Sequence, residues 1–249
     1  MGSTRSPSED KVNDVKYIKD HALMDADSAE DAQQPVALYA ARIIELQQKI
    51  ASLPAGYDPL EKADMQVAMA SLHNEINEHV DAYNCAKDAF DAFVEASAWE
   101  GAVQACNAMF HADQPESLAA LGQGIWLAVT FPTIDPELTV AMLQNVIDET
   151  PDGSDGAALA AAVARFIVDV RCKDKLHESL SFFTNQMMGT VARRHDDVES
   201  QEQFKLWIER MELDNPDVFL PRMRSVINLL VGPDWWIDTD EIQARIPDQ

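Results

Sequence analysis

Acidic and histidine side chains gather in one short stretch of the chain. His73, Glu75, Glu78 and His79 lie close together in sequence, and a helix would place Glu75 and His79 one turn apart on the same face. Helical Glu and His side chains are the ligands that hold iron or manganese in many helical bundles. That bundle signature requires Glu-x-x-His on two helices, and this sequence contains no such motif. We therefore predict no metal site and no cofactor.

The other residues with catalytic potential lack the partners that their chemistry would need. His177-Glu178 is followed by Ser181 where the zinc signature His-Glu-x-x-His requires its second histidine. The sequence also contains no Cys-x-x-Cys, no Gly-x-Ser-x-Gly elbow and no Gly-rich phosphate loop. The cysteines stand apart from one another and from any local histidine motif, which favours buried, inert thiols: Cys85, Cys106 and Cys172. We predict that the chain is not an enzyme and has no catalytic residues.

The C-terminal segment carries the surface feature that best fits a binding site. Trp235 and Trp236 are adjacent, and neighbouring residues of a helix or strand point to different sides, so one ring is expected to be exposed. Tryptophan is a preferred anchor in protein interfaces. Acidic residues surround the pair: Asp234, Asp238, Asp240 and Glu241. These six residues form the predicted partner-binding site. The alternative interpretation is that both rings fold back over an open end of the helical core.

The elements that would position these residues are helices. Apolar residues recur at alternating spacings of three and four from Val36 to Leu53, and Pro54-Ala55-Gly56 ends that pattern. Asp58 and Pro59 then mark a new helix start, with Glu61 placed to complete a capping box. The second apolar seam continues from residue 65 to residue 97 and predicts one helix of about 37 residues, roughly 55 Å long. His79 occupies this seam, where a polar residue fixes register or marks a change of partner helix.

Helix signals continue through the rest of the sequence. Starts are indicated at Pro115, Asp135-Pro136 and Ser200 with Gln203, and a break is indicated at residues 172–174. The fold class predicted is all-α, with about eight to ten helices in successive antiparallel hairpins that form an irregular bundle or a short α-solenoid. For the domains, we predict a largely disordered polar segment at 1–34 and a single helical domain at 35–249. Within that domain, 35–98 forms a hairpin, and further helices extend to about residue 231 before the tryptophan-containing tail.

Charge and composition restrict the partners. The 43 acidic and 19 basic residues give a formal net charge of −24, which opposes direct nucleic-acid binding because such binding depends on Lys and Arg contacts to phosphates. The same charge favours a basic protein partner, although adaptation to high salt is an alternative explanation. No run of about 18 apolar residues indicates a membrane span, so no membrane association is expected. An odd number of cysteines fits a reducing compartment, and we predict a cytoplasmic location.

The leading functional prediction is a non-catalytic acidic helical module, such as an adaptor, inhibitor or assembly factor, that binds a protein with a basic surface. Three alternatives remain open. One is a nucleic-acid mimic that presents carboxylates in place of phosphates. Another is a metalloenzyme that uses helix-borne Glu75, Glu78, His79 and His177. The third is a maturation chaperone for a redox enzyme subunit. It follows from the segment 148–152, Asp-Glu-Thr-Pro-Asp, which resembles the Glu-x-x-x-Pro-Asp-His loop of the helical chaperones that assist molybdoenzymes, with a shorter spacing and Gly153 in place of the His.

Overall fold

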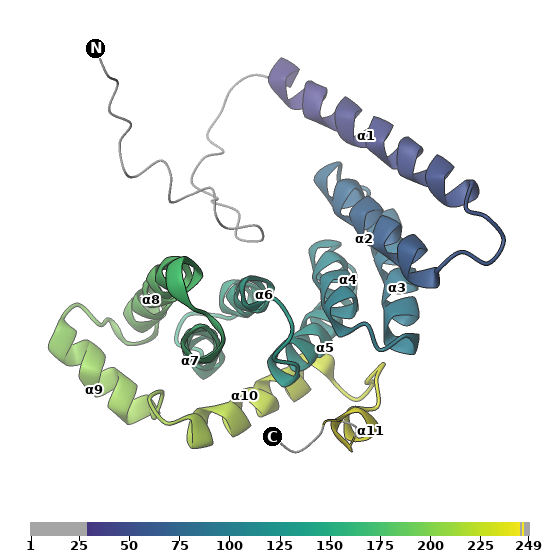
Figure 1. Cartoon of the computed structure of the whole chain (residues 1–249). Helices are drawn as coiled ribbons and strands as arrows, with labels where there is room; N and C mark the ends of the chain where they lie inside the picture. Colours follow the sequence, from purple (N-terminus) through teal and green to yellow (C-terminus); the bar gives the residue numbers. More distant parts are fainter. Residues whose placement is uncertain (1–28, 245, 247–249) are drawn as a thin grey trace, which may run out of the picture. The chain divides into compact units, whose positions relative to one another are not determined.

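The computed structural model of the chain describes residues 29–244 and 246, and every regular element among them is an α-helix (Figure 1). The prediction of an all-α fold is confirmed. Consecutive helices pack against each other in two runs, from the first to the fourth helix and from the sixth to the ninth, as expected for successive hairpins. The helices are α1 (Ala29–Ala51), α2 (Pro59–Glu75), α3 (His79–Glu95), α4 (Trp99–His111), α5 (Ser117–Thr130), α6 (Pro136–Glu149), α7 (Asp155–Arg171), α8 (Asp174–Asp196), α9 (Gln201–Met211), α10 (Pro216–Val231) and α11 (Thr239–Ala244).

The described residues divide into two units. Unit 1 comprises Ala128–Val226, and unit 2 comprises residues 29–127 together with 227–244 and 246. The prediction of one helical domain at 35–249 stays a prediction. The predicted disordered segment 1–34 lies outside the described residues except for its last six, which belong to α1.

The first helical hairpin of unit 2 forms as the sequence indicates. Ile43 and Leu46 of α1 pack with Met69 of α2 in a buried cluster that Ile50 and Leu72 extend. The side chain of Asp58 accepts a hydrogen bond from the backbone N–H of Leu60 over 2.9 Å, and Pro59 is the first helical residue. The predicted N-cap at Asp58 and helix start at Pro59 are confirmed, whereas the Asp58 side chain binds the N–H of Leu60 and not that of Glu61, so the predicted capping box does not form.

The prediction of a single long helix after Pro59 is wrong, because the chain turns back at residues 76–78. Asn77 adopts a left-handed conformation with φ of 60°, and the backbone N–H of Glu78 donates to the carbonyl of His73 over 2.9 Å. This bond closes α2 in the manner of a Schellman turn, and asparagine tolerates the left-handed region better than most residues. α3 therefore runs back along α2 instead of extending it. The predicted 35–98 hairpin is three helices, with α2 and α3 in place of one.

A second turn of the same form connects α3 to α4. Ser97 has φ of 55°, and the backbone N–H of Ala98 donates to the carbonyl of Phe93 over 2.8 Å. α4 packs on α3 and also contacts α2. Phe90 and Phe93 are buried in this group of helices, as their size predicts.

Unit 1 is organised around α7, which packs between α6 and α8. In Figure 1 these three helices are seen nearly end-on, while α9 runs across the picture. The predicted caps are present: Asp135 accepts from the N–H of Glu137, and Ser200 and Gln203 form a reciprocal capping box. α7 ends at Arg171 and α8 begins at Asp174, so the break predicted at 172–174 is confirmed. No helix within the described residues is long and apolar enough to cross a membrane.

Candidate functional site

Both tryptophans of the predicted C-terminal binding site are half-buried against helices of unit 2. The Trp236 ring meets the Phe90 ring edge-on at 5.6 Å between centroids, and the Trp235 ring meets the Trp126 ring in the same way at 6.1 Å. The Lys87 ammonium lies 5.5 Å from the centroid of the Trp236 ring. These contacts follow the alternative interpretation, in which the rings fold back onto the helical core.

The acidic members of that predicted site lie at the surface. Asp234, Asp238, Asp240 and Glu241 are all exposed. The Asp238 carboxylate caps α11 by accepting from the backbone N–H groups of Asp240 and Glu241 at 3.1 and 2.9 Å. The Asp238 carboxylate thus has a local structural role as the cap of α11.

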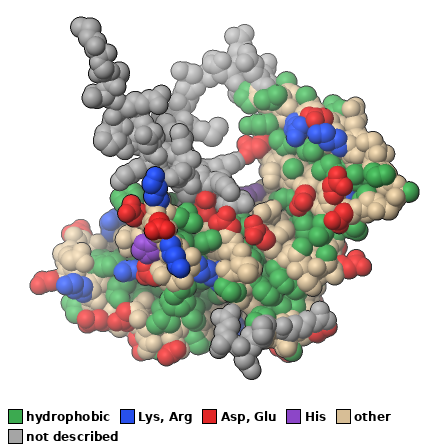
Figure 2. All heavy atoms as spheres, viewed as in Figure 1, with side chains coloured by type: hydrophobic (Ala, Val, Ile, Leu, Met, Phe, Trp, Pro, Cys, Tyr) green, Lys and Arg blue, Asp and Glu red, His purple; other side chains and the backbone are tan. Residues whose placement is uncertain are grey.

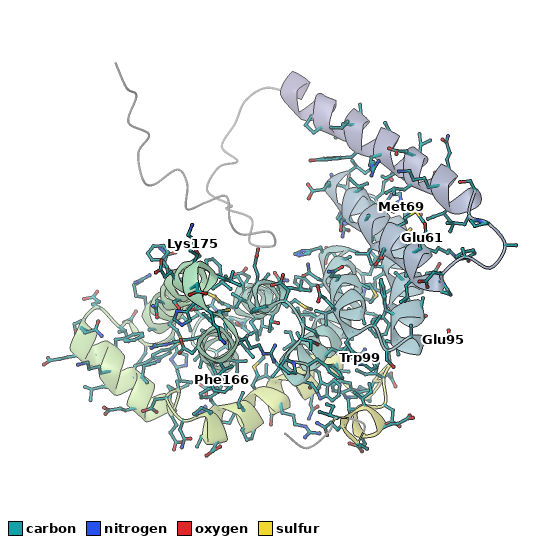
Figure 3. All side chains as sticks on the ribbon, in the orientation of Figure 1. Glu61, Met69, Glu95, Trp99, Phe166 and Lys175 are labelled. Atoms are coloured by element: carbon teal, nitrogen blue, oxygen red, sulfur yellow. The ribbon has the colours of Figure 1, made fainter. Side chains whose placement is uncertain are left out.

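Unit 1 contains an open cleft. Its volume is about 460 Å³, which falls in the range of ligand pockets in proteins. Three phenylalanine rings line it from three helices: Phe166 of α7, Phe204 of α9 and Phe219 of α10. Phe166, labelled in Figure 3, stands on the side of α7 toward α10 and meets the Phe219 ring at 5.9 Å. The remaining apolar lining consists of Ala162, Met188, Ile208, Leu213 and Pro216.

Charged side chains of both signs line the rest of this cleft. The acidic ones are Asp169, Glu209 and Asp214, and the basic ones are Arg165 and Lys205. All five are exposed, so they form a polar rim around an aromatic floor. Arg165 is close to Asp169, with 3.9 Å between Nε and Oδ2. Carboxylates therefore outnumber cations at the rim.

A largely buried histidine, His195, with 11% of its side chain exposed, links four helices of unit 1 next to this cleft. The indole N–H of Trp207 donates to His195 Nδ1 over 3.3 Å, and His195 Nε2 lies 3.2 Å from Asp155 Oδ1. Arg222 reaches the other oxygen of Asp155 at 3.3 Å. The sequence pattern gives no sign that Asp155 and Trp207 are the partners of His195. A Trp donor in place of a nucleophile makes this group a structural link rather than a catalytic triad.

Arginine side chains of unit 1 bind the carbonyl ends of helices. Arg171 donates to the carbonyls of Ala128 and Val129 at 2.8 and 2.7 Å, and Arg194 donates to the carbonyl of Ile147 at 2.6 Å. Arg222 donates to the carbonyl of Met211, also at 2.6 Å. These guanidinium groups satisfy the unpaired carbonyls that every helix leaves at its end.

Figure 2 shows Asp and Glu side chains at many places on the visible face.

One of the stretches singled out in the sequence does form a compact group of metal-type donors. His73 Nδ1 lies 2.7 Å from Glu78 Oε2, and one ligand atom each from His73, Glu78 and Asp81 fall within 4.8 Å of one another. Glu75 and His79 are not part of this group. His79 is the first residue of α3, and its Nδ1 is buried without a hydrogen-bond partner among the described residues.

The cysteines are all free thiols. Burial raises the pKa of Cys106 and of Cys172, and both side chains are buried, as the sequence predicts. Cys85 is half-buried, and burial together with the charges of Asp88 and Asp81 raises its pKa. A raised pKa keeps a thiol protonated at neutral pH, which disfavours nucleophilic chemistry.

The segment that resembles the chaperone loop joins α6 to α7. Thr150 follows the last helical residue of α6, and its hydroxyl donates to the carbonyl of Val146 over 2.9 Å. Arg194 donates to the same hydroxyl oxygen over 3.0 Å. Asp152 is exposed in the following turn. Arg194 Nε also lies 3.9 Å from Asp152 Oδ1, so Arg194 contacts this segment at both Thr150 and Asp152.

We compared the chain with models of known protein families, with curated proteins and with solved structures, and none of them matches it.

Proposed function

We propose that this chain is a non-catalytic, acidic helical module that binds a partner protein, and that the cleft of unit 1 is where the partner docks. The proposed occupant is a segment of that partner in which an apolar or aromatic side chain is flanked by Lys or Arg. The observation that carries the proposal is the aromatic floor formed by Phe166, Phe204 and Phe219.

The chemistry of the cleft supports such an occupant. Apolar rings on several helices provide the desolvated contact area that anchors a partner side chain. The surplus of carboxylates at the rim, within a chain of net charge −24, attracts cations that flank this anchor. Among the arginines of unit 1, Arg171, Arg194 and Arg222 are engaged with helix ends, which leaves fewer cations available for phosphate contacts.

Capture from the native host with matched variants tests this proposal. Phe204→Ala removes part of the cleft floor, while Leu206→Ala changes an exposed residue of the same helix that does not line the cleft. We expect a captured partner to be lost with Phe204→Ala and kept with Leu206→Ala. We also expect less partner to be retained at high salt, because screening weakens the rim charges.

A third variant separates the cleft from the C-terminal segment. If Trp236→Ala abolishes capture while Phe204→Ala leaves it intact, the tail is the interface and the cleft proposal is wrong. Equal retention of the partner at low and high salt would contradict the electrostatic part of the proposal. Circular dichroism of each variant shows whether the helical fold persists.

A further inference from the structure

We propose that His73, Glu78 and Asp81 form a zinc-binding site at the turn between α2 and α3. The three side chains come from a segment of nine residues, 73–81, and their ligand atoms lie within 4.8 Å of one another. This inference does not depend on the proposed partner binding, since it concerns unit 2 and a different ligand.

The backbone of the turn holds two of the donors in place. The N–H of Glu78 donates to the carbonyl of His73 over 2.9 Å, so residues 73 and 78 are linked across the turn by a main-chain bond. Asn77, in the left-handed conformation, makes this close return of the chain possible. The imidazole of His73 is buried, with 8% of its side chain exposed, which restricts its orientation. A donor whose position is set by the fold loses little entropy when it binds a metal.

The two carboxylates have no competing role in capping. Glu78 is the N-cap residue of α3, yet its side chain accepts no capping hydrogen bond and reaches instead to His73 Nδ1 at 2.7 Å. Asp81 belongs to the first turn of α3 and is exposed. Both carboxylates can therefore move the short distance that separates the present arrangement from metal coordination.

The donor set selects the class of metal. One imidazole nitrogen and two carboxylate oxygens suit zinc, which binds His and Asp or Glu at about 2.0–2.2 Å. Calcium and magnesium prefer sites made only of oxygen ligands. Three protein ligands on an exposed turn leave the fourth tetrahedral position to water or to a group from outside. Zinc bound there would replace the contact between His73 and Glu78 and connect the end of α2 to the start of α3.

Isothermal titration calorimetry, in which zinc chloride is added to the purified chain, tests the site. We expect one zinc ion per chain in a saturable step, and a dissociation constant at least about tenfold higher for Glu78→Gln and for Asp81→Asn. Glu95→Gln is the matched control, because Glu95 is an exposed carboxylate at the other end of α3 (Figure 3). This control should bind zinc as the unaltered chain does.

Two further measurements make the result decisive. His73→Gln should abolish the saturable step. If this substitution of a buried residue prevents folding, the test is made with the exposed carboxylate variants Glu78→Gln and Asp81→Asn. Millimolar magnesium should leave zinc binding unchanged. The proposal is overturned if magnesium displaces the zinc, if Asp81→Asn binds as tightly as the unaltered chain, or if Glu95→Gln loses as much affinity as the site variants.

Discussion

The backbone N–H of Trp236 donates a hydrogen bond to the side-chain oxygen of Gln123 over 2.8 Å. Gln123 lies on α5 and is fully buried, so the bond fastens the C-terminal segment to the interior of unit 2. The edge-on contacts of Trp236 with Phe90 and of Trp235 with Trp126 add to this attachment. The tail is thus part of the fold of unit 2.

Trp236→Ala should lower the free energy of unfolding by about 2–3 kcal/mol, less than the loss for a fully buried tryptophan because this ring is half-buried. Urea denaturation followed by circular dichroism measures the change. Leu229→Ala is the control, since that side chain is 83% exposed and should cost less than about 0.5 kcal/mol. Equal stability of the two variants would show that the tryptophan contacts contribute nothing.

Two glycines should respond in opposite directions to the same substitution. A Cβ at Gly122 would lie 2.7 Å from Val231 Cγ2 and 3.0 Å from Leu230 Cβ, so Gly122→Ala should destabilise by about 1–3 kcal/mol. At Gly189 the nearest contact would be the end of the Arg193 side chain at 3.6 Å. Gly189→Ala should therefore stabilise α8 by about 0.5–1 kcal/mol through helix propensity. Thermal melting of both variants checks the signs.

Adjacent arginines at the end of α8 should differ in importance. Arg194 donates to the carbonyl of Ile147 and to the hydroxyl of Thr150, whereas Arg193 is exposed and donates to Thr190 of its own helix. Arg194→Ala should cost about 1.5–3 kcal/mol, because it removes the charged donor at the carboxyl end of α6. Arg193→Ala should cost less than about 0.5 kcal/mol. A similar loss for both variants in urea denaturation would refute the capping role.

Alkaline pH should destabilise unit 2 because the Cys106 thiol and the Tyr83 hydroxyl have raised pKa values in the fold. Burial raises the pKa of the Cys106 thiol above its ordinary value of 9.0, and burial with nearby acidic groups raises the pKa of Tyr83 from 10.0 to about 12. The unfolded chain loses these protons first, so the stability they provide is complete below pH 9 and declines as the pH rises above it. Urea denaturation at pH 8 and pH 10 measures this decline. It should be smaller in Cys106→Ala, and an unchanged decline would exclude a contribution from this thiol.

Helix starts were predictable where local chemistry determines them. Asp58-Pro59, Asp135-Pro136 and Ser200 with Gln203 provide an acceptor for the first N–H groups within a few residues, so sequence alone identifies them. The structure departs from the predicted capping box only at Asp58, whose side chain binds the N–H of Leu60.

The turn at 76–78 and the helix that follows the next turn were not predictable in the same way. The apolar seam keeps its spacing across Asn77, so periodicity alone reads α2 and α3 as one helix. α4 begins after Ala98, which makes no side-chain cap, and no helix was predicted there. Asparagine at position 77 is the one local signal that could have indicated the break.

The candidate sites depend on tertiary contacts. Phe166 and Phe219 are far apart in sequence and meet only because α7 and α10 approach each other. His73 and Glu78 are separated by five positions, which a continuous helix would place on different faces, and the turn brings them together. Sequence could therefore supply the residue types but not their arrangement.

The closely spaced turns after α2 and α3 make neighbours in sequence neighbours in space. Such local connectivity lowers the loop entropy that must be overcome before contacts form, which favours rapid assembly of α2, α3 and α4. It also lets α1 open while α2, α3 and α4 stay folded. Among the helix pairs in substantial contact, α1 is paired with α2 and with no other helix. Amide hydrogen exchange along unit 2 should accordingly be graded, fastest in α1 and slowest in the alanine-rich interfaces of α3 and α4.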